Sequence, residues 1–193
     1  MQNVEEINKN IENKTVVMQF LQSLGFDELQ TIEIIRGIEN GVDVSVYCKE
    51  EFNAAQMKAL RLGLEEKLDV SRFADAQYDY MQMEELKQAV RSGINMDDIC
   101  NPKFSHSVMR EIRLASELNY DLTRYAKLGY SGEVLRQIRL AKKEEIDLTF
   151  FVEDNYDEYQ LNEIRLGIHS CVDITKYLLH EYNGEQMEQI RLG

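Results

Sequence analysis

Proline, tryptophan and cysteine are scarce in this sequence. One proline and no tryptophan occur in 193 residues, which argues against a loop-rich protein or a β-sandwich. The three cysteines, Cys48, Cys100 and Cys171, are too few for a disulfide framework in a chain of this length. No run of apolar residues approaches the ~20 residues of a membrane span. The segment after Met1 also lacks the basic and apolar regions of a secretory signal. These absences predict a soluble, cytoplasmic chain.

Charged and apolar residues are plentiful. The chain carries 35 acidic and 22 basic residues, a formal net charge of −13, and 44% of its residues are hydrophobic. That share of apolar residues is enough for a packed core. The length indicates one domain or two small ones.

A short motif recurs every 26 residues. Leu60-Arg61-Leu62-Gly63 returns at 112–115, 138–141, 164–167 and 190–193, with weaker copies at 34–37 and 86–89. A glycine or alanine closes every copy: Gly37, Gly63, Ala89, Ala115, Ala141, Gly167 and Gly193. No insertion breaks the period, which is typical of a repeat architecture.

Each repeat contains the signals that begin a helix. Residues that cap a helix through a side-chain oxygen recur at Asp27, Asn53, Asp79, Ser105, Ser131, Asp157 and Asn183. A glutamine three residues later completes a capping box in five repeats, at Gln30, Gln56, Gln82, Gln160 and Gln186. An aromatic residue precedes every cap, and in six repeats a methionine or leucine four residues after the cap completes a hydrophobic staple. The sequence therefore predicts seven helix starts.

The helix ends and a second, shorter element can also be predicted. Because only glycine and alanine occur at the small position, we expect a close helix approach there. The helices are expected to stop four residues later, in the left-handed conformation, at Gly41, Lys67, Gly93, Asn119, Glu145 and Cys171. A capped short helix then begins at an aspartate or asparagine. Its expected apolar anchors are Tyr47, Phe73, Ile99, Tyr125, Phe151 and Tyr177.

These patterns predict an all-α protein, a right-handed α-solenoid of seven units of about 26 residues. Each unit is a main helix plus a short helix, and the last unit is truncated. Residues 1–26 do not follow the period well and are expected to form an N-terminal helical cap of one or two helices. The predicted domains are this cap, 1–26, and a single repeat array, 27–193.

The repeat consensus also resembles a known repeat family. Gln-Met-x-x-Ile-Arg-Leu-Gly stands at 186–193, and Val-Asp-Val/Ile-Ser/Thr-x-Tyr stands at 42–47 and 172–177. This pattern resembles the 26-residue helical repeat proteins of gut Firmicutes and their mobile elements, over residues 27–193. The resemblance carries no catalytic residue. It implies a binding module, an inhibitor or adaptor encoded by a mobile element and acting on a host defence protein.

No catalytic, cofactor-binding or metal-binding motif stands out. His106, His169 and His180 fall at different positions of the repeat and lack metal-ligand spacing with any cysteine. The cysteines are expected to be small buried thiols. There is no phosphate loop, G-x-S-x-G or H-E-x-x-H motif. We therefore predict that the chain is not an enzyme and uses no cofactor or metal.

One basic residue recurs in each of six repeats: Arg61, Lys87, Arg113, Arg139, Arg165 and Arg191. If exposed along one face, these residues would form a track for an anionic polymer. Alternatively, each pairs with the aspartate eight residues on in its own repeat. The only repeat with lysine, Lys87, also has Asn95 in place of that aspartate, which favours the pairing. We predict that Arg139 contacts Asp147 or nearby backbone carbonyls.

Charge is distributed unevenly along the chain. Residues 103–143 carry nine basic and four acidic residues, whereas 1–102 and 144–193 each have a net charge of −9. The basic segment is either ordinary surface variation or a binding patch. The predicted partner-binding residues, expected to share one continuous exposed surface, are Arg110, Arg124, Lys127, Arg136, Lys142 and Lys143.

The expected function is non-catalytic binding of a protein partner through an extended acidic surface, without membrane association. The alternative is nucleic-acid engagement, either directly by the 103–143 patch or by acidic arms that mimic a phosphate backbone. A homodimer is a further prediction, formed through the C-terminal end or by pairing of the basic centre with an acidic arm.

Overall fold

The computed structural model describes the backbone of residues 4–193 and the side chains from Asn13 onward. This part of the chain contains helices and turns and no strand, so the all-α prediction is confirmed. The chain forms two compact units, one reaching to Pro102 and the other running from Lys103 to Gly193. The predicted division into 1–26 and 27–193 stays a prediction.

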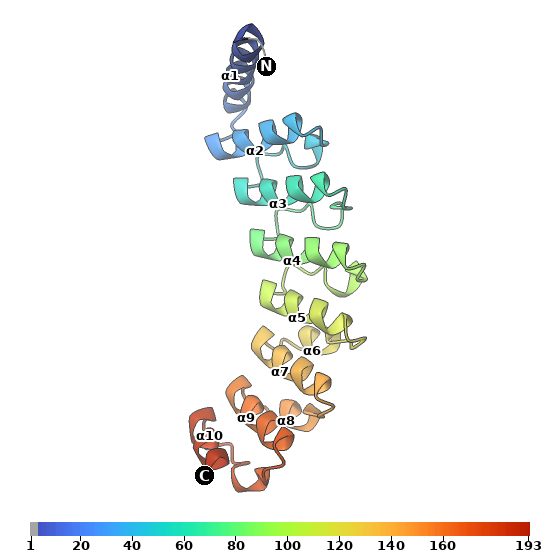
Figure 1. Cartoon of the computed structure of the whole chain (residues 1–193), viewed down its shortest axis with the longest axis vertical. Coiled ribbons are helices and arrows are strands. Elements are labelled where there is room, and N and C mark those ends of the chain that lie inside the picture. Colours follow the sequence, from blue (N-terminus) through green and yellow to red (C-terminus); the bar gives the residue numbers. More distant parts are fainter. Residues whose placement is uncertain (1–3) are drawn as a thin grey trace. The chain divides into compact units, whose positions relative to one another are not determined.

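The first unit contains four α-helices and two short 3₁₀ helices within its described residues (Figure 1). They are α1 (Val4–Ser23), α2 (Glu28–Glu39), η1 (Val44–Val46), α3 (Ala54–Glu65), α4 (Tyr80–Arg91) and η2 (Met96–Asp98). Helices α2, α3 and α4 pack in sequence order, and α1 packs on α2.

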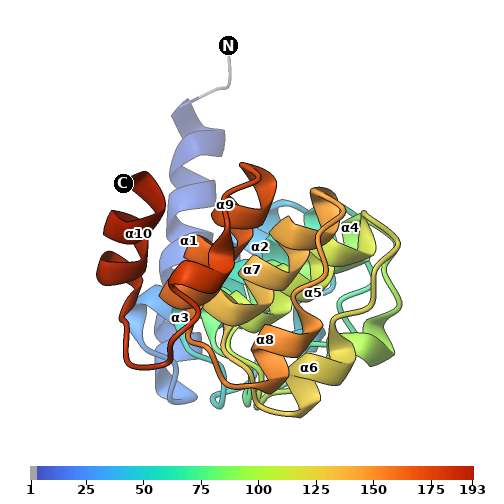
Figure 2. The ribbon, with the colours of Figure 1, turned by 90° about the horizontal axis from the view of Figure 1, so that it is seen from below.

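The second unit alternates long and short helices (Figure 2). They are α5 (His106–Ser116), α6 (Thr123–Lys127), α7 (Gly132–Lys143), α8 (Thr149–Glu153), α9 (Glu158–His169), η3 (Ile174–Lys176) and α10 (Gly184–Leu192). Helices α5, α7, α9 and α10 pack in that order.

All seven predicted helix starts are confirmed. The N-caps of α2, α3, α4, α5, α7, α9 and α10 are the predicted residues, and the five glutamine repeats form complete capping boxes. The glutamines have a second role that the sequence did not reveal. Gln30 Nε2 donates to the carbonyl of Phe52, and Gln160 Nε2 to that of Tyr182, each at 2.7 Å. A helix N-terminus is thereby tied to the chain that leads into the next main helix.

The predicted helix ends are also confirmed. The six predicted stop residues have φ values of 53–69°, although lysine, glutamate and cysteine occupy three of these left-handed positions. The following N–H donates to the carbonyl of the small residue at 2.8–3.1 Å, which satisfies a carbonyl left free at the helix end.

The short elements differ from the prediction in three ways. Residues 69–73 contain a turn at 71–73 and no helix. Helices α6 and α8 have Leu122 and Leu148 at their N-caps, without a side-chain cap. In α8 the predicted anchor Phe151 is only half-buried, whereas Val152 is fully buried. In the equivalent helix α6 the anchor Tyr125 is buried beside the small Ala126, whereas in α8 the larger Val152 takes the buried position.

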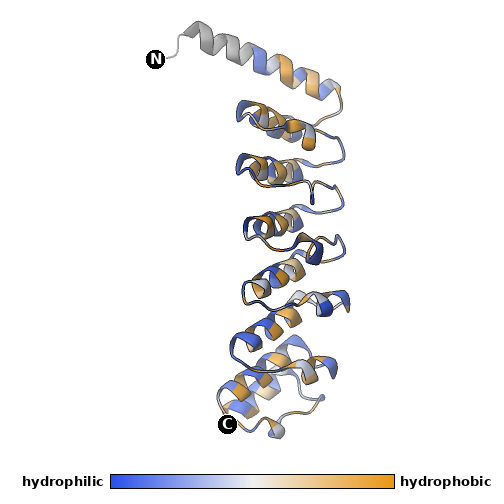
Figure 3. Ribbon diagram, turned by 90° about the vertical axis from the view of Figure 1, so that its right-hand side faces the viewer, coloured by the Kyte–Doolittle hydropathy of each residue, from blue (hydrophilic) through white to orange (hydrophobic). Residues whose placement is uncertain are grey.

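Helix α1 covers the start of the first unit incompletely. Leu21 and Phe26 are buried at its junction with α2, but Val16, Phe20 and Leu24 remain exposed. In Figure 3 the C-terminal half of α1 accordingly shows orange, hydrophobic stretches between blue, hydrophilic ones. The predicted one or two helices are therefore a single helix with one apolar face open to solvent.

Candidate functional site

The basic residue of each repeat lies between main helices and not on an exposed track. Arg61 and Arg165 are 6% and 8% exposed. Arg61 donates to Glu33 at 2.9 Å and to Glu65 at 2.5 Å. Burial opposes the charge of Arg61, but the hydrogen bonds to Glu65 and Glu33 outweigh it and raise the pKa of the guanidinium. Residues held this way inside the packing are not available to an anionic polymer.

The predicted partner of the arginine row is wrong. Arg139 Nε donates to Glu111 on the preceding main helix at 2.6 Å, and not to Asp147. Asp147 instead accepts the backbone N–H of Thr149 at 2.9 Å, and hydrogen bonds from Thr149 lower the pKa of this carboxyl. The aspartate is thus engaged in the local turn and is not free for the arginine.

Arginines of this row instead pair with the residue that stands 28 positions earlier in the chain, on the preceding main helix. Arg191 follows the same rule with Glu163 at 2.7 Å, and Arg165 bonds Gln137 at 3.2 Å. The residue 28 positions before Lys87 is Ala59, so no acid is available there. Lys87 turns to Glu84 on its own helix at 2.8 Å. The presence of lysine in place of arginine at position 87 is therefore explained by Ala59, which offers no partner for an arginine, and not by Asn95.

The six predicted partner-binding residues are all exposed and lie on three helices of the second unit. Arg110 lies on α5, and Arg136 and Lys143 lie on α7. Arg124 and Lys127 lie on the short helix α6, where Arg124 pairs with Glu153 of α8 at 3.3 Å. Lys142, in the last turn of α7, lies on a different side of that helix from Arg136, because six residues correspond to about 240° of rotation.

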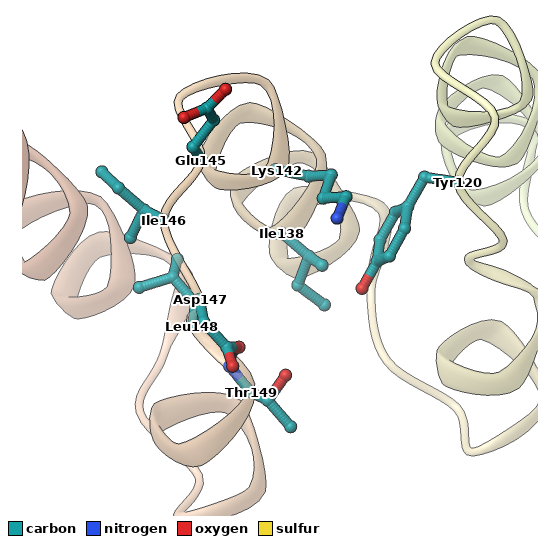
Figure 4. A pocket seen from close by; sticks show the side chains of 8 residues that line it. All are labelled: Tyr120, Ile138, Lys142, Glu145, Ile146, Asp147, Leu148 and Thr149. Carbon is teal, nitrogen blue, oxygen red and sulfur yellow. Dashed lines mark hydrogen bonds between the residues drawn. The ribbon is translucent and has the colours of Figure 1, made fainter.

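Lys142 lines a cavity of about 530 Å³ between the ends of α5 and α7. Its ammonium lies 5.2 Å from the centre of the Tyr120 ring, and Figure 4 shows these two side chains beside Ile138, with Asp147 and Thr149 opposite. The first unit has an equivalent cavity of about 550 Å³ around Asn40 and Lys67. The cavity thus occurs in more than one repeat, and its lining contains both basic and acidic side chains. These features are not specific evidence for a ligand site.

A more distinctive hollow lies across α7, α9 and α10. It measures about 290 Å³ and is lined by ten residues: Glu133, Arg136, Gln137, Glu158, Tyr159, Asn162, Glu163, Gly184, Glu185 and Glu188. We call it the acidic groove. Five of its residues are glutamates, and the guanidinium of Arg191 pairs with one of them, Glu163. The remaining lining charge is strongly negative, and Arg136 is the only cation among the lining residues.

An exposed aromatic side chain lies in this groove. Tyr159 is 68% exposed, and the start of α10 packs against its base. A Cβ on Gly184 would lie 2.5 Å from Tyr159 Cβ and 3.2 Å from its backbone carbonyl carbon, so glycine permits this approach. The equivalent positions in other repeats are Leu29, Ala55, Met81, Ser107, Glu133 and Glu185. The sequence signal for this site was an aromatic residue at a position where no other repeat has one. We did not recognise this signal in the sequence.

Other chemistry is sparse in the described part of the chain. No group of three histidine, cysteine or acidic side chains there is arranged to hold a metal ion. The expectation of buried thiols is wrong for Cys171, which is exposed, while Cys48 and Cys100 are half-buried. Burial raises the pKa of the Cys48 and Cys100 thiols, which keeps them protonated and weakly nucleophilic. Across residues 4–193, no helix combines the length and apolar character of a membrane span.

Comparison of the chain with protein-family models, with curated proteins and with solved structures finds no match.

Proposed function

We propose that this chain is a non-catalytic helical-repeat protein that binds a basic segment of a protein partner in the acidic groove. The observation that carries the proposal is the conjunction of five glutamates and the exposed Tyr159 in one hollow of α7, α9 and α10. An inhibitor or adaptor acting on a host defence protein remains the specific role that the family resemblance implies.

The proposed architecture is a right-handed α-solenoid of seven units, the last truncated. It is supported by bonds that connect successive main helices inside each unit of the chain. Glutamines at the helix starts donate to the chain entering the next helix, and arginines reach back 28 residues. Such nearest-neighbour ties are typical of repeat proteins. These bonds use the positions that recur from repeat to repeat for packing, and the outward positions stay available for binding.

The chemistry of the groove favours an arginine-bearing peptide. A guanidinium can stack on an exposed tyrosine ring while donating to carboxylates in a forked geometry. Glu158, Glu185 and Glu188 have no side-chain bond described in the structure, so binding would not first have to break an internal ion pair. Several like charges close together also attract a cation over a longer range.

Direct nucleic-acid binding is the weaker proposal. Arg136 lies among glutamates, and the other basic candidates are divided between helix α5, helix α6 and the C-terminal end of α7. A phosphate backbone needs several cations along one track, and this arrangement does not supply one.

The test is fluorescence anisotropy with a labelled arginine-rich peptide and the full chain. The variant E185Q/E188Q removes two carboxylates from the groove, and E50Q/E51Q removes two exposed carboxylates from the first unit. Both variants have the same net charge. We expect the groove variant to weaken binding about tenfold and the control by less than about threefold. Labelled duplex DNA is expected not to bind either protein.

Equal weakening in the two variants would show that the peptide responds only to overall charge, and the groove would then not be the site. Tyr159→Ser gives an independent check, because it leaves all carboxylates in place. We expect it to weaken the arginine-rich peptide more than a lysine-rich peptide of equal charge, since arginine stacks better on an aromatic ring.

A further inference from the structure

Two short helices of the second unit form a surface with opposite charges side by side. Helices α6 and α8 are neighbours in Figures 1 and 2 and are joined by the Arg124–Glu153 ion pair at 3.3 Å. Helix α6 carries Arg124 and Lys127, and helix α8 ends in Glu153 followed by Asp154. All four side chains are exposed. One helix of the pair is therefore basic and the other acidic.

Each of these helices also exposes a large apolar side chain. Phe150 of α8 is 70% exposed, and Leu128, directly after α6, is 65% exposed. At the position of Phe150 the other repeats have Val46, Arg72, Asp98, Arg124 and Lys176, so packing of the repeat does not require an aromatic ring. Phe150 is nevertheless held in place, because it meets Phe151 edge-on with ring centres 5.4 Å apart.

We propose that the α6–α8 surface is the interface of a homodimer, with a second copy of this chain as its occupant. A two-fold axis running between the two helices lays α6 of one copy on α8 of the other. Basic α6 then faces acidic α8 twice, because a two-fold interface repeats every contact. Phe150 and Leu128 supply the apolar contacts that such an interface buries at its centre.

Charge complementarity is the reason for choosing a second copy over another partner. A net charge of −13 makes two copies repel each other, so a self-interface needs a locally balanced surface. The α6–α8 surface has that balance, with two cations on one helix and two carboxylates beside the other. It is small, since it consists of two five-residue helices and their flanks, and the dimer should therefore dissociate on dilution.

Sedimentation equilibrium of the full chain over a dilution series tests the proposal. We expect a reversible monomer–dimer equilibrium, and Phe150→Ser should raise the dimer dissociation constant at least about tenfold. Tyr159→Ser is the matched control, because Tyr159 is equally exposed at 68% but lies in the acidic groove. It should leave the dimer unchanged.

Mixing two charge variants separates an interface from a contact within one chain. Lys127→Glu and Glu153→Lys each create like-charge contacts across the two-fold axis, so each protein alone should be mostly monomeric. Mixed in equal amounts, they should form a heterodimer, because both contacts then join opposite charges. Lys143→Glu and Glu181→Lys are controls with the same charge changes at other exposed positions of the unit, and should still dimerise.

Wild-type chain that sediments as a monomer at every concentration would overturn the proposal. So would a dimer that survives Phe150→Ser unchanged, or a mixture of the two charge variants that stays monomeric. None of these results bears on peptide binding in the acidic groove, which uses α7, α9 and α10.

Discussion

The contact between Gly167 and Tyr177 gives a sharp test of how the repeat packs. Gly167 lies within α9, and Tyr177 directly follows η3 and is 1% exposed. A Cβ on residue 167 would overlap the Tyr177 hydroxyl oxygen and lie 2.8 Å from Ile174 Cγ2. The close approach expected at the small position is therefore made, at Gly167, by the short helix η3 and the tyrosine that follows it.

The size of the effect follows from two opposing terms. Alanine favours a helix interior over glycine by about 1 kcal/mol, while overpacking of a close contact costs about 1–3 kcal/mol. Because the hydroxyl oxygen occupies the space that the methyl group needs, we expect overpacking to outweigh the helix gain and Gly167→Ala to lower the free energy of unfolding by up to about 2 kcal/mol. Tyr177→Phe removes that oxygen together with its 3.4 Å hydrogen bond to the Glu163 carbonyl, and should cost about 1 kcal/mol alone.

The double variant distinguishes this contact from a general loss of stability. In Gly167→Ala with Tyr177→Phe the effects should not add, and the coupling should be about 1 kcal/mol in favour of the pair. Relief should be partial, because Ile174 remains close. Urea unfolding followed by far-ultraviolet circular dichroism measures all four proteins. Ala141→Gly, at the same repeat position, is the control and should destabilise by about 1 kcal/mol.

Strict additivity in that cycle, or a Gly167→Ala protein more stable than wild type, would refute the argument. Either result would mean that Tyr177 moves aside without cost and that the glycine is retained for another reason.

Three further predictions concern caps, turns and titration. Lys67→Gly should raise the free energy of unfolding by about 1 kcal/mol, because lysine here has a φ of 60°. Thermal unfolding measures this stability, and an unchanged melting temperature would mean that the turn is not strained. Gln56→Glu keeps the acceptor for the capping box but loses the donor to the Tyr78 carbonyl at 2.6 Å, so urea unfolding should show a loss of about 1–3 kcal/mol. Gln186→Glu, which has no such downstream bond described, should lose less. Burial, followed by the influence of Cys100, raises the pKa of Tyr78 to about 12. The stability from this neutral phenol is complete below the unfolded pKa of about 10 and is lost as the pH rises from there toward 12. Because burial also raises the pKa of other tyrosines such as Tyr47, Tyr78→Phe should reduce the alkaline loss of stability in a pH series of unfolding without abolishing it.

Local chemistry explains why the helix boundaries could be predicted. A cap such as Asn53 and its partner Gln56 lie three residues apart, so the sequence displays the whole interaction. The stop at Lys67 was predictable from the phase of the repeat even though lysine disfavours a positive φ, because neighbouring repeats have glycine there. Signals inside one or two helical turns therefore predict the boundaries of the main helices, although they misplace the N-caps of α6 and α8.

Contacts between repeats were harder to predict. The sequence indicated Asp147, eight residues after Arg139, as the acidic partner, whereas the actual partner is Glu111, 28 residues earlier. Asp147 is engaged by its own turn, a competition that sequence spacing alone does not rank. The sequence clue to the 28-residue spacing was Ala59, because the one lysine of the row, Lys87, is also the one that has alanine 28 residues earlier.

The candidate site was predicted only in part. Charge counting identified exposed cations such as Arg136 and Lys142, but it could not show that they face different hollows, since this depends on rotation around α7. The acidic groove was missed because its glutamates come from three helices and appear in the sequence as ordinary solvated residues. Tyr159 was the one position whose departure from the repeat indicated the groove.

The central claim is that the acidic groove is where this chain binds a basic protein segment. Its most direct test is a titration of the isotope-labelled full chain with an unlabelled arginine-rich peptide, followed by two-dimensional NMR of the backbone amides. We predict saturable shifts concentrated on α7, α9 and α10, with Tyr159 among the largest. Shifts spread evenly over acidic surfaces of both units, or no saturable shift at all, would contradict the account.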